Sequence, residues 1–433
     1  MKFRHRMQVS SPGGDIRVCR LSNGITIITE RMDSVRSVAA GFWFTAGSRY
    51  EPPQENGISH FVEHMLFKGT ETRSAEELAR QMDALGGYTD AFTGREMVCY
   101  SFKVLDEHLA EAMELQADLV LHPRFDPDDI EKEKGVVLEE LKMGTDNPET
   151  FISDLFVRHF WKRHPLGQPI IGTRRTILSF HREALCRYHE SCYRPENLTI
   201  TAAGRLDHDR FAELAERLFG GLPPGGHRPR VKAPAPSAPL ILKSRRSLQQ
   251  VHLCLGAPTV AAADPRRHAV ILLNAILGGN MSSRLFQNIR ERQGLAYSIF
   301  SDVLLYEDAG LIGVYAGTSA DSARRLLAAV MDEIRRLREQ PPPADELAHA
   351  RESVKGAMLL GLETTSSRMS HLARQWLTHG RFFTLDEIAA ALDRVTAEEI
   401  HEEARRSFEP GKIGLAVLGR VEEAGIGPGD LEC

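Results

Sequence analysis

Residues 56–69 read NGISHFVEHMLFKG, a stretch that predicts one buried helix of about twelve residues. Asn56 can cap the start of this helix and Gly69 its end. Apolar side chains occupy most of the helical wheel, which is typical of a helix inside a protein core. The remaining arc holds His60, Glu63 and His64, so three polar side chains share one narrow face.

The spacing of these three residues predicts a metal site. His60 and His64 are four positions apart, so both imidazoles project to the same side, as two ligands of one zinc ion must. Glu63 lies beside them and could reach a water on the metal without being a ligand. The alternative is a chance pattern of core histidines, which we expect in roughly one such chain in twenty. Burying three such groups on an apolar helix without a shared function would be costly, which favours the metal.

A catalytic zinc site takes a third protein ligand and leaves a fourth position for water. A helix expected at about residues 128–143 offers Glu133 and Glu140, which are seven positions apart and within about 20° on the wheel. We predict that Glu140 is the third ligand and that Glu133 orients a ligand histidine. The expected cofactor is one zinc ion per chain, with manganese or cobalt as alternatives.

The chain has 433 residues, which at roughly 100 to 200 residues per domain predicts two to four domains. Residues 220–239 are dense in Pro and Gly and predict a linker between an N-terminal domain, 1–219, and a C-terminal domain, 240–433. Both halves order their strands and helices alike, which indicates a diverged duplication. Because hairpin-like neighbours mix with crossovers, we expect α+β domains with mixed sheets flanked by helices rather than a doubly wound fold.

Helix pairs give the best match between the halves. Residues 108–121 and 128–143 form the first expected pair, and residues 320–337 and 345–362 form the second. Aligning the second helix of each pair places Glu133 over Ala350 and Glu140 over Ala357. The first half is therefore expected to hold the polar site, and the second half only its scaffold.

Composition and charge exclude several classes of protein. The net charge of -5 provides no basic field for a nucleic acid, so no nucleic-acid partner is expected. No apolar run approaches the ~18 residues that a bilayer span needs, so no membrane insertion is expected. The N-terminus shows no secretory signal, and the six cysteines form no CxxC pair. These features predict a cytoplasmic protein.

The motif His60-x-x-Glu63-His64, followed after 75 intervening residues by Glu140, resembles the inverted zinc motif of the pitrilysin/insulinase metallopeptidases. The resemblance covers nearly the whole chain, whose length looks most like the bacterial relatives of the mitochondrial processing peptidase beta subunit. It implies two homologous α+β halves that close like a clam shell over a peptide, with zinc in the first half.

The resemblance also implies further site residues. Arg290 and Tyr297 match a pair that contacts the substrate backbone and the developing oxyanion, although the residues alone would suggest a helix end and a strand start. Gly278-Gly279 resembles a shortened glycine-rich substrate loop, or only a turn. Residues 88–93 resemble an edge strand to which substrate adds, with Asp90 where Asn is usual. The expected substrate contacts in this strand are Thr89, Asp90, Ala91 and Phe92.

The implied function is a zinc-dependent endopeptidase for short or unfolded peptides, with Glu63 as general base. One alternative is a catalytically silent scaffold, although such relatives typically lose part of the metal motif. Another is a subunit that needs a partner chain. Because Arg290, Tyr297 and the metal residues stand on one chain, we expect a self-sufficient protein, as a homodimer.

Overall fold

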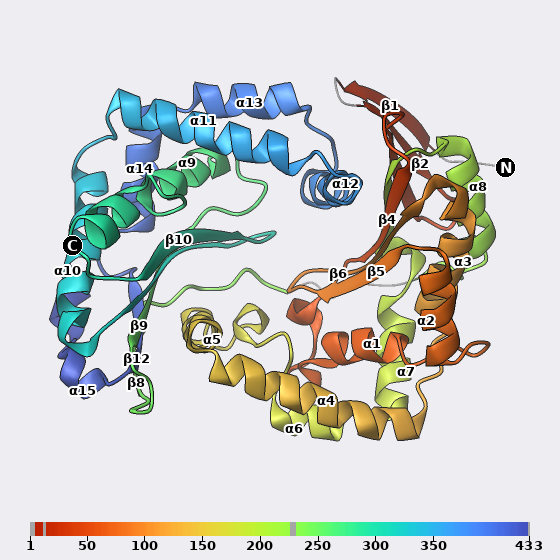
Figure 1. The fold of residues 1–433 in the computed structure, drawn as a ribbon, viewed down its shortest axis with the longest axis horizontal. Helices are drawn as coiled ribbons and strands as arrows, with labels where there is room; N and C mark the ends of the chain where they lie inside the picture. Colours follow the sequence, from red (N-terminus) through yellow and green to blue (C-terminus); the bar gives the residue numbers. More distant parts are fainter. Residues whose placement is uncertain (1–4, 12–13, 226–230, 432–433) are drawn as a thin grey trace. The chain divides into compact units, whose positions relative to one another are not determined.

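The computed structural model describes residues 5–11, 14–225 and 231–431. Two mixed sheets and fifteen labelled α-helices lie within these ranges (Figure 1). The helices are α1 (Ile58–Leu66), α2 (Ala75–Ala84), α3 (Leu109–Leu121), α4 (Pro127–Asp146), α5 (Pro148–Phe160), α6 (Arg174–Ser179), α7 (Arg182–Cys192), α8 (His208–Phe219), α9 (Arg267–Leu277), α10 (Ala323–Glu339), α11 (Ala344–Gly361), α12 (Thr365–His379), α13 (Leu385–Arg394), α14 (Ala397–Ser407) and α15 (Val421–Ala424). None of the helices in these ranges is both long and apolar enough to cross a bilayer.

Sheet 1 has seven strands in the order β1-β2-β3-β7-β4-β6-β5. Only β3 and β7 pair in parallel within it, and the other neighbours are antiparallel. The strands are β1 (His5–Ser11), β2 (Gly14–Arg20), β3 (Thr26–Arg31), β4 (Ser37–Phe44), β5 (Tyr88–Thr93), β6 (Val98–Leu105) and β7 (Leu198–Gly204). Strand β5 therefore lies at a sheet edge, as the sequence predicted for residues 88–93.

Sheet 2 has five strands in the order β10-β11-β9-β12-β8, and its single parallel pair is β12 with β8. The strands are β8 (Leu240–Ser244), β9 (Val251–Thr259), β10 (Ser298–Leu305), β11 (Gly310–Thr318) and β12 (Gly414–Gly419). The series β8, β9, β10, β11, β12 reproduces β3, β4, β5, β6, β7 in chain order, neighbours and strand sense. The two halves thus share one topology, and the predicted fold class is confirmed.

The two edge hairpins, β5–β6 and β10–β11, correspond residue by residue. Thr93 pairs with Val98 at the end of one hairpin, and Leu305 pairs with Gly310 at the end of the other. Aligning these ends places YTDAFT of β5 over FSDVLL of β10. In both strands the central aspartate, Asp90 or Asp302, accepts a hydrogen bond from the next backbone N–H. This correspondence supports the predicted duplication.

Each sheet is covered by helices on both faces. On one face of each sheet, the covering helix comes from the other half of the chain. The chain forms two compact units, one made of residues 1–142, 168–231 and 360–385, the other of 143–167, 232–359 and 386–433. Helix α12 packs on β3, β4 and β7 of sheet 1, and α5 packs on β9 and β12 of sheet 2. The compact units are therefore not the two contiguous ranges 1–219 and 240–433. The chain passes from the first unit to the second at residues 231–232, inside the predicted linker. Residues 226–230 of this linker lie outside the described residues.

The buried face of sheet 1 positions the candidate site. Aromatic side chains of β4 pack with α1 and α8, and Phe42, Phe44, Phe61 and Phe219 are all at most 1% exposed. Burial of each such side chain contributes on the order of 2 kcal/mol, so α1 is held firmly in the core. One face of α1 therefore has little freedom to move, and the side chains on its other face are fixed with it.

Candidate active site

Helix α1 presents the three polar residues that the sequence predicted on one face. Ile58, Phe61, Val62, Met65 and Leu66 are fully buried in the core, whereas His60, Glu63 and His64 are half-buried on the other face. The helix has nine residues and not about twelve, since it ends at Leu66. The separation of the two faces is what aims the imidazoles away from the core.

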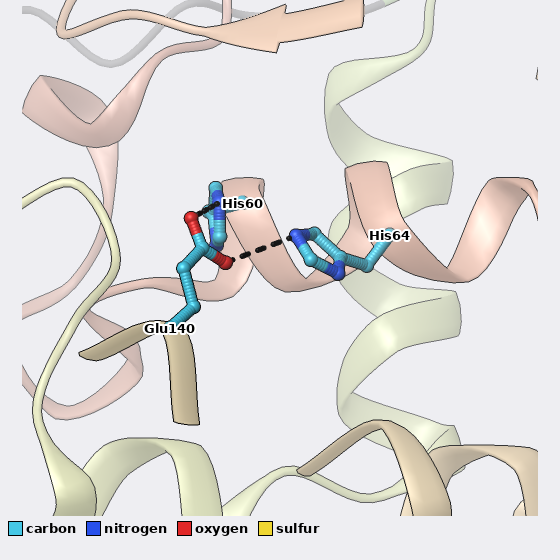
Figure 2. A group of neighbouring side chains, drawn as sticks. All are labelled: His60, His64 and Glu140. Atoms are coloured by element: carbon cyan, nitrogen blue, oxygen red, sulfur yellow. Dashed lines mark ion pairs between the residues drawn. The ribbon is translucent and has the colours of Figure 1, made fainter. Parts of the chain in front are cut away.

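Helix α4 brings its carboxylates to the two histidines. Glu140 Oε1 lies 3.5 Å from His60 Nε2, and Glu140 Oε2 lies 3.4 Å from His64 Nε2. Figure 2 shows the carboxylate of Glu140 between the two imidazole rings. Ligand atoms of the three residues lie within 4.8 Å of one another. The structure thus brings together the three residues that the sequence predicted as metal ligands.

The donor set fits zinc. Zinc bonds of about 2.0 to 2.2 Å at tetrahedral angles place neighbouring ligand atoms about 3.3 to 3.6 Å apart. The two nitrogen–oxygen distances of 3.5 and 3.4 Å fall in this range. Two imidazoles and one carboxylate also match the ligand types of catalytic zinc sites. Zinc would be held by His60, His64 and Glu140.

Glu133 contacts Nδ1 of His64, whereas Glu140 contacts Nε2. Its Oε1 lies 2.8 Å from His64 Nδ1, and its Oε2 lies 2.7 Å from Lys68 Nζ. The Glu133 side chain is only 4% exposed. Burial would raise the pKa of Glu133, but the hydrogen bonds from His64 and Lys68 lower it. The structure therefore places Glu133 where the sequence predicted an orienting carboxylate, and Lys68 adds a cation that sequence reasoning missed.

Two of the predicted metal ligands have strongly shifted pKa values in the metal-free site. Burial lowers the pKa of His64, but its hydrogen bonds to Glu133 and Glu140 outweigh burial and raise that pKa to about 9. Hydrogen bonds from His60 and His64 hold the pKa of Glu140 far below its usual range. Glu140 is therefore anionic across the physiological range, which suits a metal ligand.

Glu63 has the environment of a general base. Burial raises its pKa, and a hydrogen bond donated by the Thr93 hydroxyl to Glu63 Oε2 opposes this effect. A carboxylate with a raised pKa accepts a proton more readily near neutral pH. Thr93 is the last residue of β5, so the base is tied to the edge strand. Sequence reasoning missed this contact, because spacing along the chain carries no signal for it.

Comparison with known proteins now identifies the family. Residues 26–174 match the model of the insulinase family, peptidase family M16, and residues 179–354 match the model described as the peptidase M16 inactive domain. An uncharacterized zinc protease of Bacillus subtilis is 40% identical over 386 residues, 89% of this chain and 94% of that protein. The chain belongs to the M16 family. The predicted family is thereby confirmed.

Further proteins are similar to this chain over more than nine tenths of its length. An uncharacterized zinc protease of Mycobacterium tuberculosis is 37% identical, with 92% of each chain covered. A peptidase M16 inactive domain from Pseudomonas fluorescens has a TM-score of 0.88 at 21% identity and covers 93% of this chain and 98% of its own. A protease from Helicobacter pylori has a TM-score of 0.86 at 20% identity, covering 96% and 100%. The two solved structures support the fold.

The M16 edge strand β5 exposes alternate residues. Tyr88, Asp90 and Phe92 are exposed, and Thr89 and Ala91 are half-buried. The Phe92 ring contacts the buried Trp43 edge-on, with 5.8 Å between ring centroids. Among the described residues no further strand pairs with its outer side, where a substrate strand could add. Contact of Thr89, Asp90, Ala91 and Phe92 with substrate stays a prediction.

Arg290 and Tyr297 lie together in the second unit. The Arg290 guanidinium lies 5.7 Å from the centroid of the Tyr297 ring and 4.5 Å from that of Phe286. Arg290 stands in a π-helical turn, Phe286–Glu291, of the kind often found at functional sites. Tyr297 is 81% exposed, so its hydroxyl is free to contact a ligand. Their role toward substrate stays a prediction.

Gly278 and Gly279 have a packing reason in the structure. A Cβ on Gly278 would lie 2.6 Å from the backbone nitrogen of Ser301, whose N–H donates to the Gly278 carbonyl. A Cβ on Gly279 would lie 3.1 Å from Cα of Ala275. Close approach of α9 to β10 therefore accounts for glycine at Gly278 without a ligand. Their proposed contact with substrate is untested.

The start of α1 differs from the prediction. Asn56 does not cap the helix, because the N-cap residue is Gly57, at φ +94°, and has no side chain. The Asn56 amide instead donates to Glu51 Oε2, at 3.0 Å. Gly69 lies beyond the helix end, in a left-handed turn at φ +117°. Sequence reasoning did not predict that Glu51 contacts the start of α1. A turn separates Glu51 from the helix, so helical spacing gives no signal for this contact.

Proposed function

We propose that this M16 chain is a zinc-dependent endopeptidase that hydrolyses short or unfolded peptides. The observation that carries the proposal is the cluster of His60, His64 and Glu140, with Glu63 on the same helix face and β5 beside it. Bound zinc supplies a Lewis acid that polarises a carbonyl and acidifies a water. The names of the relatives, uncharacterized zinc proteases, support the peptidase class.

In the proposed reaction, substrate pairs with the outer edge of β5 and extends past Thr93 towards α1. Glu63 accepts a proton from the attacking water and donates it to the nitrogen of the departing amine, which balances the proton count. Glu133 keeps a hydrogen bond to His64 Nδ1, so that Nε2 stays available for the metal. Arg290 and Tyr297 are proposed to stabilise negative charge on the carbonyl oxygen.

A silent scaffold is the weaker alternative. His60, Glu63, His64 and Glu140 are all present and lie in a geometry that fits zinc. The description "inactive domain" applies to the family model matched by residues 179–354, whereas the metal residues lie in the insulinase match at 26–174. We therefore propose an active chain that works without a second kind of subunit, as a homodimer.

A quenched-fluorescence peptide library tests the proposal. Purified protein is expected to cleave unfolded peptides, to lose this activity with a chelator, and to regain it when zinc is returned. Size-exclusion mass in the same preparation tests the homodimer. A folded, zinc-loaded protein that cleaves no peptide in the library would contradict the endopeptidase proposal and favour the silent scaffold.

A further inference from the structure

Glu51 lies beneath the start of the metal helix and is only 2% exposed. Its Oε2 accepts hydrogen bonds from Gly57 N, at 2.7 Å, and from the Asn56 amide, at 3.0 Å. Its Oε1 accepts from Ser59 N, at 2.8 Å. Both carboxylate oxygens therefore serve backbone donors of the first turn of α1.

The first turn has no cap of its own, which gives Glu51 its importance. The first N–H groups of a helix lack partners within the helix, and a Ser, Thr, Asp or Asn at the N-cap usually satisfies them. Here Gly57 occupies that position at φ +94°, and a Cβ on it would lie 2.6 Å from the Ile171 carbonyl oxygen. A side chain cannot be accommodated there. Glu51 supplies the missing acceptors from outside the helix, and its negative charge suits the helix N-terminus.

A second contact fixes the same turn. The Ser59 and Tyr188 hydroxyls share a hydrogen bond of 2.6 Å, and the Tyr188 hydroxyl lies 3.1 Å from the Ala46 carbonyl oxygen. Burial raises the pKa of Glu51 to about 7, against the hydrogen bonds from Ser59, Gly57 and Asn56, which lower it. The donors arranged around the buried carboxylate thus hold its pKa lower than burial alone would.

The two ligand histidines depend on different supports. His64 stands one turn into α1 and is held by Glu133. His60 directly follows Ser59 in the first turn, and its buried Nδ1 has no hydrogen-bond partner among the described residues. Apart from the contact of its Nε2 with Glu140, the position of the His60 imidazole is therefore set by the helix start and hence by Glu51. Fraying of this turn would move His60 and leave His64 in place.

We infer that Glu51 is a positioning residue of the metal centre, which fixes His60 by capping α1 from outside the helix. The inference rests on the proposed zinc site. It predicts that Glu51 acts on metal affinity and ligand geometry, beyond any effect on stability.

Glu51→Gln tests this inference, because an amide offers one acceptor oxygen where the site uses two. The glutamine NH₂ would face either Ser59 N–H or the donors of Gly57 and Asn56. We expect zinc affinity, measured by chelator competition on metal-free protein, to fall about tenfold or more. The absorption spectrum of the cobalt-loaded protein should change as well, since it reports ligand geometry. Circular dichroism confirms that the variant is folded.

Asp207→Ala is the matched control. Asp207 is also a carboxylate that caps a helix of the first unit, α8, by accepting from Arg210 N at 2.9 Å. The Asp207→Ala substitution should lower the stability of the protein and leave its zinc affinity and cobalt spectrum unchanged. If Glu51→Gln fails to fold, Asn56→Ala removes one donor and keeps the backbone donors, with an expected loss in zinc affinity of about threefold.

Unchanged zinc affinity and an unchanged cobalt spectrum in a folded Glu51→Gln protein would overturn the inference. Equal losses of zinc affinity in Glu51→Gln and Asp207→Ala would also overturn the inference, because the loss would then come from lower overall stability. Unchanged affinity in Asn56→Ala overturns it if Glu51→Gln does not fold. A folded wild-type protein that binds no zinc would refute the proposed function itself, which is a separate result.

Discussion

Glu133 Oε1 lies 2.8 Å from Nδ1 of His64, on the side of the ring opposite Glu140. When the ring is neutral, a hydrogen bond donated from Nδ1 would leave the Nε2 lone pair available to a metal held with Glu140. In the proposed site, one carboxylate would thus select the tautomer of His64, and another would share the metal with it. Both come from α4, seven residues apart, so one helix sets both interactions.

Glu133→Gln should weaken zinc binding by about 10- to 100-fold. The amide keeps the size of the side chain but loses the charge that Lys68 and His64 share. Chelator competition on metal-free protein measures the change. Glu131→Gln, an exposed position on the same helix, is the control and should have no effect. Equal zinc affinities in wild type and Glu133→Gln would remove Glu133 from the site.

Zinc affinity should depend steeply on pH. In the metal-free protein the pKa of His64 is raised to about 9, above its usual 6.5. Since zinc binds the neutral ring, it must displace a proton below pH 9, and affinity should fall about tenfold for each pH unit between 8.5 and 7. The stability of the metal-free protein should change with pH in the opposite direction to zinc affinity. The raised pKa stabilises that fold fully below pH 6.5, and this stabilisation is lost as the pH rises through 9.

Titration of zinc affinity over this range, with Glu133→Gln beside wild type, checks the prediction. Glu133→Gln replaces the charged acceptor that raises the pKa of His64 by a neutral one, so the pH dependence of the variant's zinc affinity should be weaker. A wild-type affinity that stays constant from pH 8.5 to 7 would mean that His64 is already neutral.

Helix α12 should be held to sheet 1 by a buried ion pair. Arg368 Nη1 donates to Glu30, which is 3% exposed on β3. Arg368→Met leaves this carboxylate buried without its cation and should destabilise the protein by about 3 kcal/mol in urea unfolding. Arg374→Met, an exposed change on the same helix, should cost less than about 0.5 kcal/mol. Similar losses in the two variants would show that the ion pair does not hold α12.

The metal residues could be predicted from sequence because they follow helical periodicity. His60 and His64 share a face at spacing four, and Glu133 and Glu140 share one at spacing seven, so two helices that pack together suffice to assemble the site. The fold class could also be predicted, because hairpin-like neighbours and crossovers mix in both halves, and the edge strand β5 followed from the family resemblance.

Other features have no local signal. Glu51 reaches α1 through a loop whose path depends on Gly57 and Gly172 packing against each other. The exchange of α5 and α12 could not be predicted, because an amphipathic helix shows that it packs on a sheet but not on which one. Gly278 resembled part of a substrate loop, yet its contact with Ser301 of β10 explains the glycine through tertiary packing.

The zinc-peptidase assignment is tested most directly by Glu63→Gln. Glu63 carries the raised pKa of a base and lies beside the ligands without joining them. The variant should bind one zinc ion per chain by metal analysis, as wild type does, and lose peptide hydrolysis by a factor of about 10² to 10⁴. Retained zinc with lost turnover is the predicted result. Wild-type turnover by zinc-loaded Glu63→Gln would contradict it.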